Sequence, residues 1–406
     1  MKILILNAGS SSQKSCFYEI AFGEVPNEAP KPLWEAAVDW THQAGVAEIK
    51  VKTATGNTLK LEVPAQSRLQ VTQRLLATLW DGETAVMQNP SDIDVVGHRV
   101  VHGGQQYSQP VRITEAVKTE IGRLAVLAPV HNPVNLEGIE AIEQILGADM
   151  PQFAVFDTAF HRDLPEAAAI YPGPYEWVER GIRRYGFHGI SHAYCADRAA
   201  QLLQQELSAL RLIICHLGNG CSLSAVHQGH CIDTTMGFTP LDGLMMGARS
   251  GAVDPGILIH LVRQEGYTAD QLDLELNQTS GLKGISGISS DLRAVMEAIE
   301  VGNPRAQLAL DIYLHRLRSC MGSMLASLGG VDAIVFTAGV GENSAIVRAR
   351  ACAAFGFLGL QLDEAKNQAR PVDLDIATAA STVRVLVIHT QEDWAIAKAC
   401  YQCLSS

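Results

Sequence analysis

Three short stretches of the sequence combine glycine with serine or asparagine, and each follows an apolar run that is typical of a strand. The first is Asn7-Ala-Gly-Ser-Ser-Ser12, followed by Lys14, and the others are Gly218-Asn-Gly220 and Ala338-Gly-Val-Gly341. Glycine lets several backbone N–H groups approach one anion, and serine hydroxyls add hydrogen-bond donors of little bulk. The stretches are therefore candidate phosphate-binding loops, with an ordinary polar turn as the alternative at each of them.

The spacing of these glycines excludes two familiar nucleotide-binding motifs. The pattern G-x-x-x-x-G-K-[ST] is absent, as is G-x-G-x-x-G between a strand and a helix. A nucleotide site in this chain would instead use hairpins and the strand-to-helix turn at residues 338–341. Glycines that precede a helix, which we expect to begin at Glu342, suit a phosphate or a sugar edge.

Two arginines have sequence surroundings that suit an anion. Arg99 lies at the end of an apolar run, where a bare charge is costly unless it is paired, and Arg249 is flanked by glycines that admit a ligand. A structural ion pair is the alternative for both. His188 and His192 have an i, i+4 spacing that could hold zinc, but the glutamate of the metalloprotease motif is missing between them.

Composition limits the classes of protein. The chain has 406 residues, of which 47% are hydrophobic and 18% charged, and this predicts an ordered protein of two domains. Its formal net charge of −12 disfavours nucleic acid as a partner. Nine cysteines without a paired framework indicate free thiols and a cytoplasmic protein, and we expect no signal peptide and no membrane span. Cys400 and Cys403 form a lone C-x-x-C pair, which is too little for a structural zinc site.

The hydrophobic pattern predicts a mixed α/β fold. Residues 4–20 and 213–229 each read as strand, small-residue turn and strand, so we expect a duplication in which each half contributes one loop to a shared cleft. The expected strands are 2–6, 16–20, 48–51, 59–63, 95–101, 153–156, 212–216, 222–226, 333–336 and 383–388. The expected helices are 71–87, 115–126, 133–145, 255–263, 291–299, 305–328 and 394–403.

Taken together, the motifs resemble the acetate kinase family. The segments that carry the resemblance extend over essentially the whole chain: 7–12, 97–104, 128–133, 156–161, 185–189, 216–220, 233–240 and 339–343. The resemblance implies an α/β fold of two duplicated domains of the actin-like ATPase (ribonuclease H-like) type around an ATP cleft. The N-terminal domain would comprise residues 1–150 plus 384–406. The C-terminal domain, 151–383, would carry most of the nucleotide site and the dimer interface.

The resemblance also implies an activity. The enzyme would be a homodimer that transfers the γ-phosphoryl group of ATP reversibly and directly to acetate, with Mg²⁺ or, as an alternative, Mn²⁺, giving acetyl phosphate and ADP. A carboxylate is already ionised near neutral pH, so the task is to align two anions and offset their charge. The alternatives are a propionate or other short-chain carboxylate kinase and an actin- or Hsp70-like ATP-binding module.

Individual residues receive roles from the same resemblance. The catalytic set is Arg99, Asp157, His188 and Arg249. The acyl-substrate set is Arg99, Val101, Val130, His131, Phe187 and Pro240. The ATP set is Ser10, Ser12, Lys14, His216, Leu217, Gly218, Asn219, Gly220, Gly339, Val340, Gly341, Glu342 and Asn343. The metal set is Asn7, Asp157 and Glu392.

Two departures from the family pattern bear on these roles. Gln391 and Asp393 replace the expected Asn and Glu, which leaves the placement of the carboxylates open. Ala248 and Ala252 replace a threonine and an acidic residue near Arg249, so that arginine must be oriented by other groups.

Overall fold

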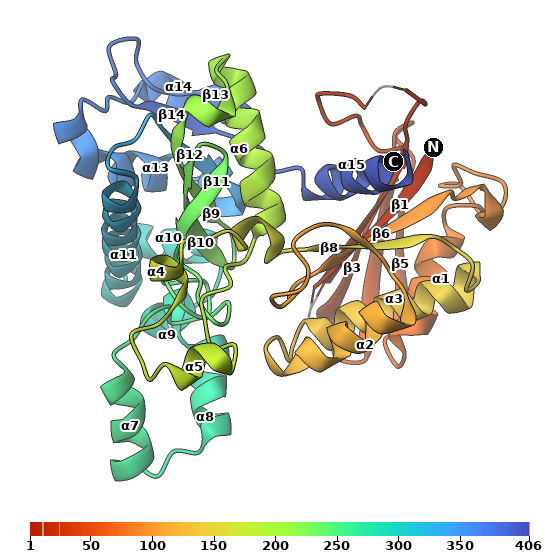
Figure 1. Cartoon of the computed structure of the whole chain (residues 1–406), viewed down its shortest axis with the longest axis horizontal. Helices are drawn as coiled ribbons and strands as arrows, with labels where there is room; N and C mark the ends of the chain where they lie inside the picture. The colour runs from red at the N-terminus through yellow and green to blue at the C-terminus, as the bar shows by residue number, and fades with distance from the viewer. Residues whose placement is uncertain (10–11, 24, 406) are drawn as a thin grey trace. The chain divides into compact units, whose positions relative to one another are not determined.

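The computed structural model describes residues 1–9, 12–23 and 25–405, without the side chains of residues 41 and 42. The chain forms two compact units. The first unit comprises Met1–Ala159 and Gln391–Ser406, and the second comprises Phe160–Thr390. Figure 1 labels the elements of both.

An eight-stranded mixed sheet forms the centre of the first unit, in the order β5-β4-β3-β2-β1-β6-β8-β7. The strand β1 is antiparallel to β2, whereas β1, β6 and β8 are mutually parallel neighbours. Both faces of β1 are covered, which explains why Ile3 to Leu6 are all apolar. The strands are β1 (Lys2–Ala8), β2 (Ser12–Glu19), β3 (Trp34–Gln43), β4 (Val46–Thr53), β5 (Thr58–Pro64), β6 (Val95–Val100), β7 (Val111–Arg112) and β8 (Gln152–Phe156).

A six-stranded sheet in the second unit repeats that arrangement, in the order β11-β10-β9-β12-β14-β13. The strand β9 is antiparallel to β10, and β9, β12 and β14 are mutually parallel neighbours. These strands match β3-β2-β1-β6-β8-β7 in order and direction, so the duplication predicted from the two hairpins is confirmed. The strands are β9 (Arg211–Leu217), β10 (Cys221–His227), β11 (His230–Thr234), β12 (Ala333–Thr337), β13 (Leu374–Asp375) and β14 (Arg384–Val387).

Helices cover both faces of the first sheet. The helices α1 (Arg68–Ala77) and α3 (Asn132–Leu146) pack on the face that contains Leu4 and Leu6. The helix α2 (Glu115–Arg123) packs beside α3, and α15 (Glu392–Ser405) packs on the face that contains Ile5. A Cβ at Gly97 of β6 would lie 2.7 Å from Cys400 Sγ of α15, so glycine permits this close contact. Cys400 is therefore a packed core residue.

In the second unit, α6 (Gly189–Leu203) packs against β9 and β12 on one face of the sheet, and α11 (Pro304–Leu328) lies against β10 (Figure 1). The other helices are α4 (Glu166–Ala169), α5 (Glu176–Glu179), α7 (Pro255–Gln264), α8 (Ala269–Leu274), α9 (Gly281–Ser286), α10 (Leu292–Glu300), α12 (Ala338–Asn343), α13 (Ala345–Cys352) and α14 (Glu364–Gln368). Among the helices of the described residues, none combines the length and apolar character that a membrane crossing requires.

Several expected elements differ in the structure. The helix expected over 71–87 is wrong in extent, because α1 ends at Ala77 and turns continue the chain. The helix expected to begin at Glu342 begins at Ala338 instead. The expectations contained neither β3 nor α6.

The last strand also lies elsewhere than expected. The expected division gave β8 to the C-terminal domain and β14 to the N-terminal one. That division is wrong for both strands. β8 belongs to the first sheet, because Gln152 pairs with Val96 of β6. β14 belongs to the second sheet, because Arg384 pairs with Ala333 of β12. The chain therefore returns to the first unit only at Gln391, with α15.

Candidate active site

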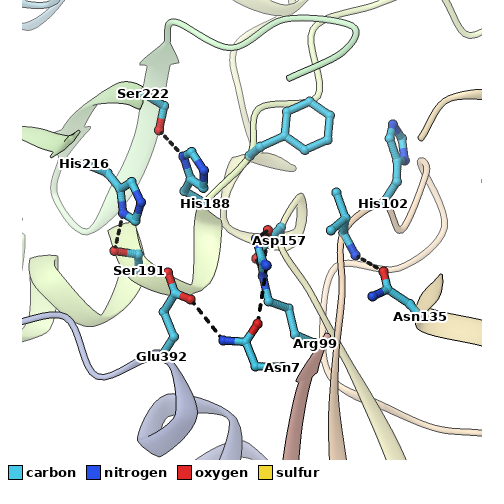
Figure 2. A network of polar contacts seen from close by, with 12 residues as sticks. Asn7, Arg99, His102, Asn135, Asp157, His188, Ser191, His216, Ser222 and Glu392 are labelled. Atoms are coloured by element: carbon cyan, nitrogen blue, oxygen red, sulfur yellow. Dashed lines mark hydrogen bonds and ion pairs between the residues drawn. The ribbon is translucent and has the colours of Figure 1, made fainter. Parts of the chain in front are cut away.

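Three polar side chains of the first unit meet at one edge of its sheet. Asn7, Arg99 and Asp157 stand at the carboxyl ends of the parallel neighbours β1, β6 and β8 (Figure 2). Ligand sites of open α/β sheets form at this edge, because parallel strands present their last residues together. The topology thus brings together residues that are 92 and 58 positions apart in the chain.

Arg99 and Asp157 form a nearly buried ion pair. Arg99 Nε donates to both carboxylate oxygens of Asp157 at 3.1 Å, and Nη2 also contacts Oδ2. Burial raises the pKa of the Asp157 carboxyl, and the guanidinium opposes that shift. Burial alone would lower the pKa of Arg99, but the carboxylates of Asp157 and Glu392 raise it. The ion pair that the sequence left open for Arg99 is therefore present, and each group fixes the orientation of the other.

Asn7 links this ion pair to the start of α15. Its amide oxygen accepts from Arg99 Nη1 at 3.4 Å, and its amide nitrogen donates to Glu392 Oε2 at 3.4 Å and to Asp393 Oδ1 at 3.2 Å. Burial raises the pKa of Asp393, and the neighbouring Glu392 adds to the shift. The sequence reasoning assigned no role to Asp393, although an acidic pair that opens a helix was a visible signal.

The donor set of this cluster fits a magnesium ion. Asp157 and Glu392 supply carboxylate oxygens, and Asn7 supplies an amide oxygen, which are the ligand types that Mg²⁺ prefers. The described residues contain no group of three or more His, Cys, Asp or Glu side chains arranged to hold a metal by themselves. That agrees with Mg²⁺, which usually takes one or two carboxylates and completes its shell with waters and phosphates.

The loop after β6 is held by asparagines of α3. The backbone N–H of Val101 donates to Asn135 Oδ1 at 3.1 Å, and Asn135 Nδ2 donates to Ala8 O at 2.9 Å. Asn132 bonds both backbone groups of His102. The sequence reasoning gave neither asparagine a role.

The proposed acyl and phosphate residues of the first unit differ in exposure. Val101 is buried, whereas Val130 is 54% exposed and precedes His131, the residue that opens α3. Ser12 and Lys14 are exposed, and Lys14 pairs with Asn7 in the β1–β2 hairpin. Ser10 lies outside the described residues.

In the second unit, an imidazole and a guanidinium converge on one glycine. A Cβ at Gly220 would lie 3.4 Å from His188 Nε2 and 3.6 Å from Arg249 Nη1. Any larger residue at position 220 would therefore crowd both groups. Both side chains carry N–H groups that can donate hydrogen bonds, and both lie beside the turn that joins β9 to β10.

Arg249 has no carboxylate partner among the described residues. Its Nη1 donates to the backbone carbonyl of Pro240 at 3.1 Å and contacts Met246 Sδ. Burial lowers the pKa of Arg249, yet a guanidinium stays charged at physiological pH because its ordinary value is so high. The ion-pair alternative is thus not found for Arg249 in the described residues, and its positive charge is available to an anion.

His188 is held from two sides. Its Nδ1 lies 2.9 Å from Ser222 Oγ, and its ring stacks on that of His216 with centroids 4.1 Å apart (Figure 2). His216 Nδ1 lies 2.8 Å from Ser191 Oγ. His188 also adopts a left-handed backbone conformation, with φ of 57°, at the start of α6. Such backbone strain in a non-glycine residue is common at functional sites.

The two glycine loops of the second unit adjoin because β9 and β12 are parallel neighbours. A Cβ at Gly218 would lie 3.7 Å from both His216 Nε2 and the Cβ of Ala338. The backbone N–H of Gly247 donates to Asn219 O at 3.1 Å, which ties the loop of Arg249 to the same turn. The proposed ATP residues from Gly339 to Asn343 all lie in α12, which follows β12 directly.

The Glu342 carboxylate is used inside its own unit. Its Oε1 accepts from the N–H groups of Ala338 and Thr390, and its Oε2 pairs with His389 Nδ1 at 2.6 Å. Burial works to raise the pKa of Glu342, but these hydrogen bonds lower it below its ordinary value. Glu342 thus shapes the loop, a function that the sequence did not indicate.

Comparison with known proteins identifies the family. Residues 2–398, nearly the whole chain, match the family model described as the Acetokinase family. The chain belongs to the acetokinase family. This acetokinase is 67% identical over 404 residues to the acetate kinase of Nostoc sp., with 100% of each chain covered. It is 64% identical over 406 residues to the acetate kinase of Cyanothece sp., and the aligned region covers 100% of this chain and 99% of that relative.

Solved structures of acetokinases have the same fold. A Porphyromonas gingivalis acetate kinase superposes with a TM-score of 0.90 at 39% identity, covering 99% of both chains. A propionate kinase from Francisella tularensis superposes with a TM-score of 0.88 at 36% identity, covering 98% of both chains. The expected fold class, an actin-like ATPase with two duplicated halves, is confirmed for this acetokinase.

Proposed function

We propose that this protein is an acetate kinase, which transfers the γ-phosphoryl group of ATP reversibly to acetate and forms acetyl phosphate and ADP. Family membership and the high identity to relatives named acetate kinases support this activity. The observation that carries the proposal is the convergence of His188 and Arg249 on Gly220. An in-line phosphoryl transfer needs such charge-offsetting groups and no base to activate a carboxylate.

Arg249 and His188 offset the charge that develops on the transferring phosphoryl group. The guanidinium supplies several N–H donors in one plane, and the imidazole supplies a further donor at its Nε2. Arg99 contacts the acetate carboxylate or the acetyl phosphate oxygens with the N–H groups that Asp157 and Asn7 leave available. Asp157 keeps the guanidinium in that orientation.

Asp157 and Glu392 would hold a magnesium ion, with Asn7 beside them. When bound, the ion neutralises charge on the phosphate oxygens of the nucleotide. Mn²⁺ can replace it, because it has the same preference for oxygen ligands. Asp393 helps to orient Asn7 through its hydrogen bond at 3.2 Å.

ATP binds to the glycine loops of the second unit. The residues that line it there are His216, Leu217, Gly218, Asn219, Gly220, Gly339, Val340, Gly341 and Asn343, with Glu342 shaping the second loop. In the first unit, the proposed phosphate contacts are Ser12 and Lys14 of β2, together with Ser10, which lies outside the described residues. The duplicated hairpins thus perform the same task in each half of the chain.

Acetate is the preferred acceptor, and the residues proposed to contact it are Val101, Val130 and His131 of the first unit and Phe187 and Pro240 of the second. Propionate is the alternative acceptor, because a propionate kinase superposes on this chain with a TM-score of 0.88. We further propose that the enzyme acts in the cytoplasm, which agrees with cysteines that are scattered along the sequence without a paired framework.

The enzyme acts as a homodimer that forms through the second unit. The helix α7 has the mainly apolar sequence PGILIHLVRQ, yet none of its residues is buried. Ile257, Ile259 and Val262 are 50%, 52% and 47% exposed. Monomeric proteins rarely leave so much apolar surface together, and a second copy of this chain is the occupant that we propose for it.

An acyl-hydroxamate assay with ATP, Mg²⁺ and a series of short carboxylates tests the function. We expect acetyl phosphate with acetate, less product with propionate and little with butyrate. Excess chelator abolishes the reaction, and full activity in chelator contradicts the metal assignment. ATP hydrolysis without acyl phosphate would support an ATP-binding module instead.

A further inference from the structure

Two imidazoles of the second unit share one buried hydroxyl group. Ser222 Oγ of β10 lies 2.9 Å from His188 Nδ1 and 2.7 Å from His192 Nε2. Ser222 and His192 have no exposed surface. A serine hydroxyl has a single proton, so it donates to one of these nitrogens and accepts from the other. The direction of this short chain determines which nitrogen of His188 carries a proton.

The surroundings of His192 set that direction. Its Nδ1 is buried and has no hydrogen-bond partner in the part of the chain that the structure describes. Burial, with His161 and His216 as neighbours, lowers the pKa of His192, so the ring is neutral and has one N–H. A buried N–H without a partner is rarer and more costly than an unused acceptor. The proton therefore belongs on Nε2, where it is donated to Ser222.

We infer that His192 and Ser222 are positioning residues that fix the tautomer of His188. His192 Nε2–H donates to Ser222 Oγ, and Ser222 O–H donates to His188 Nδ1. His188 then carries its proton on Nε2, the nitrogen that lies near Gly220 and Arg249. The inference rests on the proposed function only in assigning this N–H to a phosphoryl oxygen.

The tautomer matters because the two forms of a neutral imidazole present opposite groups to an anion. The Nε2–H form offers a hydrogen-bond donor to a phosphoryl oxygen, whereas the Nδ1–H form turns a lone pair toward it. Stacking on His216 and the left-handed backbone at His188 fix where the ring lies. Neither of them selects the protonated nitrogen. Ser222 supplies that selection.

Nuclear magnetic resonance of protein labelled with ¹⁵N-histidine reads the tautomer directly and without turnover. The His188 signals are assigned by their loss in the His188→Gln variant. In the unmodified protein we expect Nδ1 of His188 to be unprotonated and Nε2 to be protonated. Ser222→Ala should give a mixture of the two tautomers. A protonated Nδ1 in the unmodified protein overturns the inference.

Kinetics of paired variants supply a second readout. Ser222→Ala should lower kcat about 10- to 100-fold, the size usual for a partner that fixes a functional imidazole, with KM for ATP unchanged. Ser224→Ala is the matched control, because Ser224 is equally buried on β10 but donates to Thr234 Oγ1 at 3.3 Å. It should keep normal kcat. Equal kcat in Ser222→Ala and the unmodified protein contradicts the inference.

Two substitutions at His192 separate the hydrogen bond from packing. His192→Gln keeps an N–H donor near the position of Nε2 and should retain more activity than His192→Leu, which has none. Equal losses of activity in the two variants would show that His192 acts only through packing and would contradict the inference. If the unmodified protein forms no acyl phosphate, the proposed function fails, while the resonance measurement still decides the tautomer.

Discussion

Two arginines with similar sequence surroundings have different electrostatic environments. Arg99 is paired with the buried carboxylate of Asp157, whereas Nη1 of Arg249 contacts a backbone carbonyl and a thioether. A charge without a counter-charge in the protein is available for a ligand, and a charge within an ion pair also supports the fold. Substitutions of the two residues should therefore have different consequences.

For Arg249→Ala, we expect kcat to fall about 10²- to 10⁵-fold, as when a cation opposite a transferring phosphoryl group is removed. The melting temperature should stay the same or rise, because no buried carboxylate loses its partner. Arg249→Lys should remain strongly impaired, since an ammonium cannot reproduce the planar set of donors. Arg263→Ala, an exposed residue of α7, serves as the control. Near-normal turnover in Arg249→Ala would exclude the proposed role.

Arg99→Ala should lower both activity and stability. Its removal leaves Asp157 buried without its counter-charge, and breaking one side of such a pair costs about 3–5 kcal/mol of unfolding free energy. Only 17% of the Arg99 side chain is exposed, so water cannot readily replace the lost partner of Asp157. Denaturant unfolding measures the loss. Asp157→Asn in the Arg99→Ala background should recover part of the stability, and no recovery would contradict this electrostatic explanation.

Val101→Ala should shift acceptor preference toward propionate. The backbone of Val101 is fixed by Asn135, so a smaller side chain opens space rather than moving the loop. One methylene is worth about 1–3 kcal/mol, or 10- to 200-fold in kcat/KM, in an apolar site. The ratio of kcat/KM for propionate and acetate measures the shift. The control Val126→Ala, at a 77% exposed site, should leave the ratio unchanged.

At the scale of elements, the sequence predicted strands better than the contacts between them. The apolar runs of β1, β6, β8, β9 and β12 are visible in the sequence, and each was predicted as a strand. The ion pair of Arg99 with Asp157 was not predictable, because pairing of β6 with β8 brings together residues 58 positions apart.

The helix α6 shows why part of the second cluster was missed. Its buried face is made of small residues such as Cys195, Ala196 and Ala199, which give a weak hydrophobic signal. His192 was weighed only as a zinc ligand, although it lies on this helix and bonds Ser222. Spacing alone does not distinguish a metal ligand from a residue that orients a neighbour.

Packing of α15 against β6 gives a prediction at this scale. A Cβ in Gly97→Ala would lie 2.7 Å from Cys400 Sγ and 2.8 Å from Ile396 Cγ2, so α15 must shift. Such overpacking costs about 1–3 kcal/mol. Since α15 begins with Glu392 and Asp393, the variant should also need more Mg²⁺ for half-maximal activity.

The control for Gly97→Ala is Gly138→Ala in α3, where an added Cβ meets no atom within 4 Å. Alanine is favoured in a helix interior, so this variant should gain about 0.5–1 kcal/mol. A melting temperature of Gly97→Ala equal to that of the unmodified protein would show that α15 accommodates the methyl group.

For the whole molecule, the apolar surface of α7 predicts the oligomeric state. The double substitution Ile257→Asp with Ile259→Asp should convert a dimer into a monomer, because it would bury two charges in each copy of the interface. Light scattering during gel filtration measures the mass. Val301→Asp, at an 85% exposed position of the same unit, should leave the mass of the dimer unchanged. A monomeric unmodified protein would contradict the proposed homodimer.

The chain order of the two units also has a consequence for biosynthesis. The first unit is interrupted by the second, and its last helix, α15, is translated only after Thr390. At usual elongation rates the ribosome needs on the order of 10 to 50 s to make the intervening segment, during which the first sheet lacks one covering helix. The second unit is continuous and can fold during that interval. Glu392 and Asp393 can join Asn7 only after the second unit has been translated, so the first unit gains these two carboxylates later than the strands that carry Asn7, Arg99 and Asp157.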